Sequence, residues 1–130
     1  MWYKDNIFHR HGGPAIIAYF ENGQIRFTSW YKNGYLCRSN GTPARISYFE
    51  NGQIYEEVWY TNEKLHRPGG APAIITYFEN GQIQKEEWYK DGKRHNDAGA
   101  PAFISYFDDG TVYDILWYIN GNLQLSPTAI

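Results

Sequence analysis

A seven-residue phrase, YFENGQI, occupies residues 19–25 and returns unchanged at 48–54 and 77–83, with the altered form YFDDGTV at 106–112. Each copy begins 29 residues after the previous one. A Trp-Tyr pair keeps nearly the same period, at 2–3, 30–31, 59–60, 88–89 and 117–118. A Pro-Ala pair precedes each phrase, at 14–15, 43–44, 72–73 and 101–102. A fixed period of this length is typical of repeat proteins, in which each unit packs mainly on its neighbours.

The content of each unit predicts strands joined by tight turns. Aromatic residues make up 18% of the 130 residues, and no segment has the apolar spacing of an amphipathic helix. The phrase contains a dipeptide that is typical of a two-residue type I′ hairpin turn; its copies are Asn22-Gly23, Asn51-Gly52, Asn80-Gly81 and Asp109-Gly110.

Counting outward from Asn22-Gly23 predicts the register of the first hairpin. The predicted pairs are Phe20 with Ile25, Tyr19 with Arg26, Ala18 with Phe27, Ile17 with Thr28 and Ala15 with Trp30. The same count places Ala44, Ala73 and Ala102 opposite Trp59, Trp88 and Trp117. A small residue opposite the largest one favours close packing, because the indole needs the space that alanine leaves.

A second turn is expected after each Trp-Tyr pair. Its candidates are Asp5-Asn6, Asn33-Gly34, Asn62-Glu63, Asp91-Gly92 and Asn120-Gly121. It pairs Tyr3 with Phe8, Tyr31 with Leu36 and Tyr60 with Leu65, and it sets His9, His66 and His95 opposite Trp2, Trp59 and Trp88. A corner rich in Gly and Pro follows, such as RPGGAP at 67–72, and it either ends the short strand or bends it into the next unit.

These patterns predict an all-β protein built as an elongated antiparallel β-hairpin repeat array that forms a single sheet. We expect one repeat domain over 1–130. Its four strand-pair units span 14–31, 43–60, 72–89 and 101–118, with partial units at both ends.

The phrases WYKNG, WYKDG and YFENGQI resemble those of MORN-type repeat proteins, including YwqK-family antitoxins and repeat proteins of phages and giant viruses. The resemblance covers Trp2 to Leu123 and implies stacked β-hairpins in an extended single-layer sheet, with a role in binding and scaffolding. The 29-residue period is longer than the MORN unit, and the Gly-x-Gly strand signature of the family is missing.

Charge and composition narrow the classes of partner. The net charge is −2, with 12 basic and 14 acidic residues well mixed. Neither nucleic acid nor an anionic membrane is therefore an expected partner. The chain lacks an apolar stretch of membrane-spanning length and an apolar leader, and its single cysteine, Cys37, cannot form an internal disulfide. These features favour a cytoplasmic protein.

Three recurring columns raise the question of chemistry. Equivalent positions of successive hairpins lie roughly 10 Å or more apart, so we expect neither a metal in the column of His9, Cys37, His66 and His95 nor any cofactor. Only His9 and His11, which are two residues apart, could lie on one face and bind a metal together. The column of Arg10, Arg38 and Arg67 either binds an anion, or ties down corner carbonyls or pairs with carboxylates of a neighbouring unit. The carboxylates Glu21, Glu50, Glu79 and Asp108 are expected at a solvated turn edge, and the absence of a catalytic motif predicts a protein that is not an enzyme.

The second strand of each hairpin keeps its ends and varies in its middle, which is typical of the binding surface of a repeat protein. The candidate protein-binding residues are Arg26, Phe27, Tyr55, Glu57, Gln84, Glu86, Tyr113, Ile115 and Leu116. Variation at undemanding solvent positions is the alternative.

Three hypotheses of function follow from these observations. The first is a non-enzymatic interaction module that binds a protein partner, such as an antitoxin-like or phage- or virus-encoded inhibitor. The second is a homo-oligomeric scaffold that pairs through open strand edges. The third is a binder of small ligands or glycans through an aromatic ladder.

Overall fold

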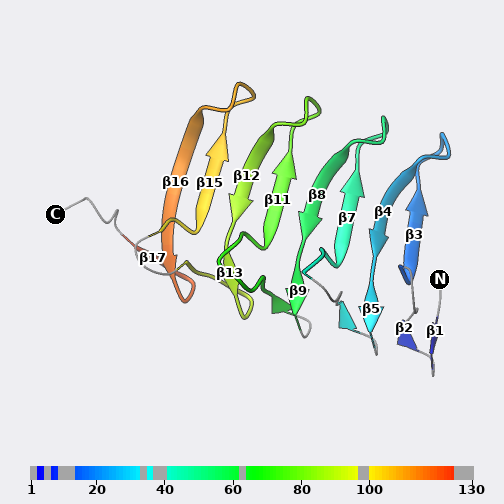
Figure 1. Ribbon diagram of the computed structural model, residues 1–130, viewed down its shortest axis with the longest axis horizontal. Helices are drawn as coiled ribbons and strands as arrows, with labels where there is room; N and C mark the ends of the chain where they lie inside the picture. Colours follow the sequence, from blue (N-terminus) through cyan, green and yellow to red (C-terminus); the bar gives the residue numbers. More distant parts are fainter. Residues whose placement is uncertain are drawn as a thin grey trace.

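The protein is an antiparallel β-sheet array without a helix among the residues that the computed structural model describes, namely 3–4, 7–8, 14–32, 35–36, 41–61, 64–96 and 100–124. Nine strands form the main sheet in the order β17-β16-β15-β12-β11-β8-β7-β4-β3 (Figure 1). They are β3 Ile16–Tyr19, β4 Ile25–Ser29, β7 Arg45–Tyr48, β8 Ile54–Val58, β11 Ile74–Tyr77, β12 Ile83–Glu87, β15 Phe103–Tyr106, β16 Val112–Ile119 and β17 Asn122–Gln124. The predicted all-β hairpin array is confirmed.

Short hairpins extend the second strands beyond one edge of the main sheet. Their strands are β1 Tyr3–Lys4, β2 Ile7–Phe8, β5 Tyr31–Lys32, β6 Tyr35–Leu36, β9 Tyr60–Thr61, β10 Lys64–Leu65, β13 Tyr89–Lys90 and β14 Lys93–Arg94. We call the side of the sheet where these short hairpins lie the base. The opposite side, where the strands are joined by the YFENGQI turns, is the tip (Figure 1). After β10, residues 66–73 contain no strand, so the Gly/Pro corner ends the short strand.

The turn at the tip differs from the predicted type I′ turn. The Phe20 amide donates to the Gln24 carbonyl at 2.8 Å, and the Gly23 amide donates to the Phe20 carbonyl at 3.0 Å. Only Gly23 has positive φ, 88°, whereas Asn22 does not and instead accepts the Gln24 amide on its side-chain oxygen at 2.9 Å. The loop therefore has three residues and ends in a glycine bulge, which costs Asn22 no left-handed strain.

A second bulge restores the predicted register further along the hairpin. Tyr19 pairs with Ile25, not with Arg26, and the register shifts between Ala18 and Tyr19. Beyond the shift, Ala18 pairs with Phe27 and Ile17 with Thr28, as predicted. Arg26 is the extra residue, and the same shift recurs in the other hairpins, where the extra residues are Tyr55, Gln84 and Tyr113.

The base turns follow the prediction where they are described. Asp91 and Gly92 have φ values of 50° and 84°, and Asn120 and Gly121 have 48° and 85°, as a type I′ turn requires. The predicted pairs Tyr3 with Phe8, Tyr31 with Leu36 and Tyr60 with Leu65 are present. The turns at Asp5-Asn6, Asn33-Gly34 and Asn62-Glu63 lie outside the described residues.

The small core lies at the base and is built from alanine and tryptophan. Ala15, Ala44, Ala73 and Ala102 are fully buried. The Trp59 amide donates to the Ala73 carbonyl of the next unit at 2.8 Å. The Trp59 indole Nε1 donates to the carbonyl of Gly41, in the corner that precedes its unit, at 2.9 Å. The last strand pair at the base of the second hairpin is Arg45 with Val58, and beyond it the Ala44 amide donates to the Val58 carbonyl. The predicted pairing of Ala44 with Trp59 is therefore not one of the strand pairs.

The Trp59 indole is held between two successive corners. The Arg67 guanidinium carbon lies 3.8 Å from the centre of the Trp59 ring, on the corner that follows Gly41. Trp88 repeats the bond to its own corner, with Nε1 donating to the Gly70 carbonyl at 3.0 Å. Burying Trp59 to 7% exposure contributes on the order of 2–3 kcal/mol. The corners therefore supply the packing layer that the flat sheet lacks.

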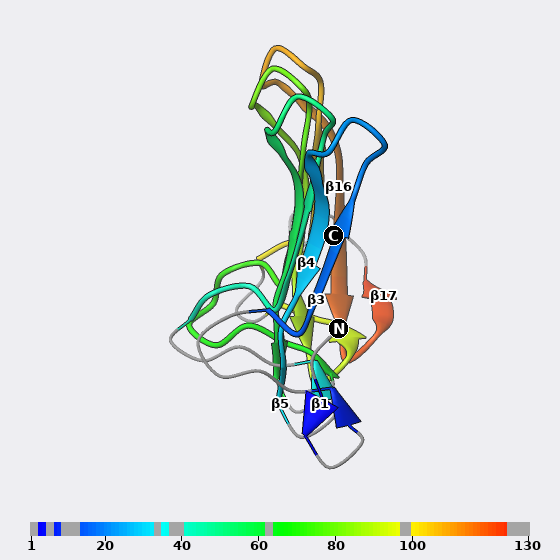
Figure 2. The same ribbon diagram turned by 90° about the vertical axis from the view of Figure 1, so that its right-hand side faces the viewer.

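The two halves of the sheet differ in thickness. Seen edge-on, the tip half is a single layer of strands, whereas corner segments project from the sheet at the base (Figure 2). We call face A the side that carries Phe27, Glu56, Lys85 and Asp114, and face B the side that carries Thr28, Glu57, Glu86 and Ile115, because side chains alternate along a strand. Alternation places Trp59, two residues after Glu57, on face B.

The glycine bulge gives a direct test of the tip turn. Gly52 has φ 90° and nothing lies within 4 Å of a Cβ built on it, so a substitution there meets strain without a clash. We expect Gly52→Ala to lower the free energy of unfolding by about 1 kcal/mol and Gly52→Asn to lower it less, because Asn enters the left-handed region more readily. Urea denaturation measures both. Equal stability of Gly52→Ala and the wild type would contradict this turn geometry.

Candidate interaction surface

The structure divides the nine predicted binding residues between the two faces. Alternation places Phe27 and Leu116 on face A, and Glu57, Glu86 and Ile115 on face B. The remaining four are the bulge residues Arg26, Tyr55, Gln84 and Tyr113. They do not form one surface, so we consider the groups in turn.

Two bulge residues form exposed aromatic pairs near the tip. The ring centroids of Tyr55 and Phe49 lie 5.1 Å apart at 66°, and those of Tyr113 and Phe107 lie 5.0 Å apart at 74°. Tyr55 is 41% exposed and Tyr113 is 68% exposed. Edge-to-face contacts hold the rings in fixed orientations while much of their surface remains in water. Phe49 follows Tyr48 of face B in alternation, so the Phe49–Tyr55 pair lies on face A.

The pairs occur in alternate units. Arg26 and Gln84 occupy the same bulge in the first and third hairpins. Four strand spacings, about 19 Å, therefore separate Tyr55 from Tyr113. A partner that contacts both pairs has to span this distance.

Glu57 and Glu86 join successive units on face B. The Tyr77 hydroxyl donates to Glu57 Oε1 at 2.5 Å, and the Tyr106 hydroxyl donates to Glu86 Oε1 at 2.6 Å. Burial, helped by the bond to Glu57, raises the pKa of Tyr77, and burial with the bond to Glu86 raises the pKa of Tyr106 to about 12. These two glutamates have a structural partner and do not act as free display groups.

Phe27 and Leu116 are partly covered on face A. The Arg45 guanidinium carbon lies 4.4 Å from the centre of the Phe27 ring. Leu116 pairs with Phe103 across β15 and β16 and is half-buried. Both residues offer less free surface than the aromatic pairs.

A polar row crosses face A between the bulges and the base. Glu56, Lys85 and Asp114 stand in this row opposite the small residues Ser47, Thr76 and Ser105. Burial raises the pKa of Glu56, although nearby Lys85 lowers it in part. The small residues leave room beside each long side chain, as the alanines do at the base.

An ion pair replaces an apolar pair at one base position of face A. The Arg94 Nη2 donates to Glu87 Oε1 at 3.0 Å, Nε donates to the Tyr89 hydroxyl at 3.2 Å, and Glu87 is only 5% exposed. The equivalent residues of the second unit are Val58 and Leu65, and those of the fourth are Leu116 and Leu123. The third unit thus carries opposite charges at both positions, which keeps the buried carboxylate paired.

The arginine column has a structural role at its described member. Arg67 Nη1 donates to the Pro72 carbonyl at 3.2 Å, and its guanidinium covers the Trp59 ring. Asn96, at the same position, donates to the Pro101 carbonyl at 2.8 Å. These contacts match the expectation that the column ties down corner carbonyls. Arg10 and Arg38, the other members of the candidate anion site, lie outside the described residues.

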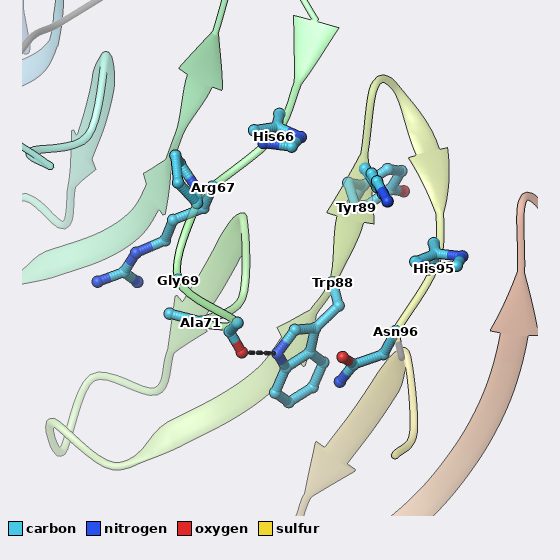
Figure 3. A pocket seen from close by; sticks show the side chains of 11 residues that line it. His66, Arg67, Gly69, Ala71, Trp88, Tyr89, His95 and Asn96 are labelled. Atoms are coloured by element: carbon cyan, nitrogen blue, oxygen red, sulfur yellow. Dashed lines mark hydrogen bonds between the residues drawn. The ribbon is translucent and has the colours of Figure 1, made fainter. Parts of the chain in front are cut away.

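A small cavity lies between the corner of the third unit and its Trp88. Its volume is about 190 Å³, and its lining includes His66, Trp88, His95 and Asn96 (Figure 3). His66 Nδ1 accepts the Asp91 amide at 3.2 Å, and His95 Nδ1 accepts the Asn120 amide at 3.0 Å. Both histidines thereby cap the base turn of the next unit. Within the described residues no three His, Cys, Asp or Glu side chains cluster as metal ligands, and His9, His11 and Cys37 lie outside that part of the chain.

Charge is separated between the two edges of the sheet. The tip segments 19–26, 48–55, 77–84 and 106–113 hold five carboxylates and one basic residue, Arg26. The described residues of the short hairpins and corners hold seven basic residues, namely Lys4, Lys32, Lys64, Arg67, Lys90, Lys93 and Arg94, and one acidic residue, Asp91. The charges look well mixed along the sequence, but among the described residues the tip is mainly acidic and the base mainly basic.

Comparisons with protein-family models, curated proteins and solved structures found no match to this chain. The similarity to MORN-type repeats therefore stays a prediction. A search of the described residues for a helix long and apolar enough to cross a membrane found none.

Some functional features had a signal in the sequence that pairwise counting missed. Tyr77 and Tyr106 each lie 20 residues after their glutamate partners, a recurrence visible once the period is known. The charge separation emerges when the carboxylates are assigned to tip turns. The glycine bulge of the tip turn had no such signal, because the dipeptide Asn-Gly is compatible with a two-residue loop and with a three-residue loop.

The Glu87–Arg94 pair can be tested against the chain's own apolar alternative. Arg94→Leu leaves a buried carboxylate without its guanidinium, and we expect a loss of about 2 kcal/mol in the free energy of unfolding, since Arg94 is partly exposed. Glu87→Val/Arg94→Leu copies Val58 and Leu65 and should return to within about 1 kcal/mol of the wild type. Additive losses in urea denaturation would show that the pair is not coupled.

The Tyr106–Glu86 bond predicts a pH dependence of stability. Unfolded tyrosine ionises near pH 10, whereas the pKa of Tyr106 in the folded chain is about 12. The folded state holds the proton longer, so this stabilisation is complete below about pH 10 and is lost as the pH rises toward 12. Stability measured over this range should fall less steeply in Tyr106→Phe and in Glu86→Gln than in the wild type. Identical slopes would contradict the bond.

Proposed function

We propose that the protein is a non-enzymatic β-repeat interaction module that binds a protein partner through face A of its tip half. The observation that carries the proposal is the pair of exposed edge-to-face aromatics, Phe49–Tyr55 and Phe107–Tyr113. Tyrosines that are held in place and partly in water are typical of binding hot spots, because little conformational entropy is lost when they are covered.

The architecture supports this division of labour. The corners and tryptophans hold the base together, while the tip half is one strand thick (Figure 2). Exposed aromatic side chains lie on face A of that half, namely Tyr55, Phe107 and Tyr113. Such a surface favours recognition of another protein over catalysis, which requires clustered acids, bases or nucleophiles. An antitoxin-like or inhibitory role is one form that this recognition would take.

The aromatic-ladder hypothesis receives less support. Trp59 is 7% exposed and is covered by Arg67, and the Trp88 indole nitrogen is bound to Gly70. A glycan would have to displace these contacts to stack on the indoles. Sheet extension through the edge strands remains the alternative, and its signature is a molar mass that rises with concentration.

Affinity purification with paired variants tests the proposal. Wild-type protein immobilised on a resin and incubated with a lysate of its native host should retain a partner protein in a stoichiometric amount. The Tyr55→Gln/Tyr113→Gln variant should retain at least about tenfold less of that partner. Glutamine is the natural residue at this bulge in the third hairpin, Gln84, so the fold should tolerate it.

The matched control is Tyr19→Gln, which removes an exposed tyrosine from face B. It should retain the partner at the wild-type level. Equal recovery on the wild type and the double variant, or equal depletion on the control, would contradict a partner site at the aromatic pairs of face A. Light scattering over a dilution series distinguishes the scaffold alternative, because a constant monomer mass removes it.

A further inference from the structure

A cleft at the tip combines aromatic walls with a carboxylate rim. Its volume is about 500 Å³, within the range of roughly 300–1,000 Å³ typical of ligand sites. Phe20, Phe49 and Tyr55 contribute rings from two successive units, and Glu50 and Glu79 contribute carboxylates from two successive turns. None of the seven residues that line the cleft is basic.

This combination suits a cation with a flat, weakly hydrated head. A guanidinium stacks on an aromatic ring within about 6 Å of its centre and binds a carboxylate through two parallel hydrogen bonds. An ammonium group is more strongly hydrated and lacks the planar fork, so it satisfies only part of the site.

The same protein already packs arginine on its aromatic rings elsewhere in the sheet. Guanidinium carbons lie 4.4 Å from the Phe27 ring centre, 3.8 Å from that of Trp59 and 5.3 Å from that of Phe103. Those arginines are Arg45, Arg67 and Arg94, and they cover aromatic surface that the single-layer sheet would otherwise expose. The tip cleft offers rings of the same kind, together with two exposed carboxylates.

The net negative charge of the whole tip also favours binding of a cation. The tip segments hold five carboxylates against Arg26, so the field near the turns attracts a positive group and repels an acidic one. The base hairpins, which are basic, would repel the same group.

We propose that the cleft between the first three tip turns binds an arginine side chain of the partner, which therefore presents a basic segment to this edge of the sheet. The inference rests on the proposed function, because it names the chemistry of the partner at that surface. The guanidinium lies against Phe49 and Tyr55 and pairs with Glu50 and Glu79.

Two small probes test the cleft without the partner. Nα-acetyl-arginine methylamide is titrated into the intact, isotope-labelled protein and followed by NMR of aromatic and backbone signals. We expect saturable shifts at Phe49 and Tyr55, and at least about fivefold weaker binding of the neutral citrulline analogue, which keeps the shape of the side chain but not its charge.

Matched variants separate the cleft from the general charge of the tip. Glu50→Gln/Glu79→Gln should weaken binding of the arginine probe at least fivefold. Glu21→Gln/Asp108→Asn removes the same charge from two tip residues that do not line the cleft and should weaken binding less than twofold. Tyr55→Gln should weaken it, and Tyr113→Gln should not. Equal binding of the two probes, equal losses in the two double variants or absence of saturable shifts would overturn the inference.

The outcome is distinguishable from failure of the proposed function. If the arginine probe does not bind but a partner is still lost on Tyr55→Gln/Tyr113→Gln, the interaction module stands and the arginine site is wrong. If the probe binds with the expected variant pattern and no partner depends on the aromatic pairs, the arginine site stands and the proposed docking surface is wrong.

Discussion

The insertion of Trp59 between two successive Gly/Pro corners, repeated in part by the bond of Trp88 to Gly70, is the contact on which the array depends. A flat sheet of hairpins has no second layer in which to bury apolar surface, and isolated hairpins are marginal in water. Trp59 meets this constraint by donating its amide to Ala73 of the next unit and its indole to Gly41 of its own corner, while Arg67 covers the ring. The indole therefore joins neighbouring units as well as filling space. The fully buried alanines at the Pro-Ala positions provide the room for this packing.

Stability concentrated at the base leaves the tip half free to vary. The ladder hydrogen bonds continue to the tip, but the sheet there has no cover on either side (Figure 2). Tyrosine–glutamate bonds between units, such as Tyr77 to Glu57, reinforce the tip half across face B without closing it. The consequence is a rigid surface whose exposed residues differ from unit to unit, with aromatic pairs on alternate hairpins and carboxylates at every turn. Under the proposed function, the residues that hold the array are separate from those that would recognise a partner.

Much of the fold could be predicted from the sequence because the repeats report the same geometry several times. The strand pairs Ala18–Phe27 and Tyr60–Leu65 follow from turn positions alone. The tip turn was predicted with the wrong type, yet the register survived because the three-residue loop and the bulge at Arg26 offset each other. Contacts that depend on side-chain reach were harder to predict. Glu57 and Glu86 looked like variable display residues, but their hydroxyl partners come from the next unit, and only three-dimensional register brings them together.

Amide hydrogen exchange tests most directly whether the tryptophan–corner layer anchors the array. The account predicts that the slowest amides lie at the base: those of Trp59 and Trp88, which bond to the next unit, and those of Ala73 and Ala102, which bond within their own unit. The tip amides of Phe49 and Phe78 should exchange faster, although they are also hydrogen-bonded. Tip amides as slow as the base amides, or slower, would contradict the claim that the layer of indoles and corners holds the sheet together.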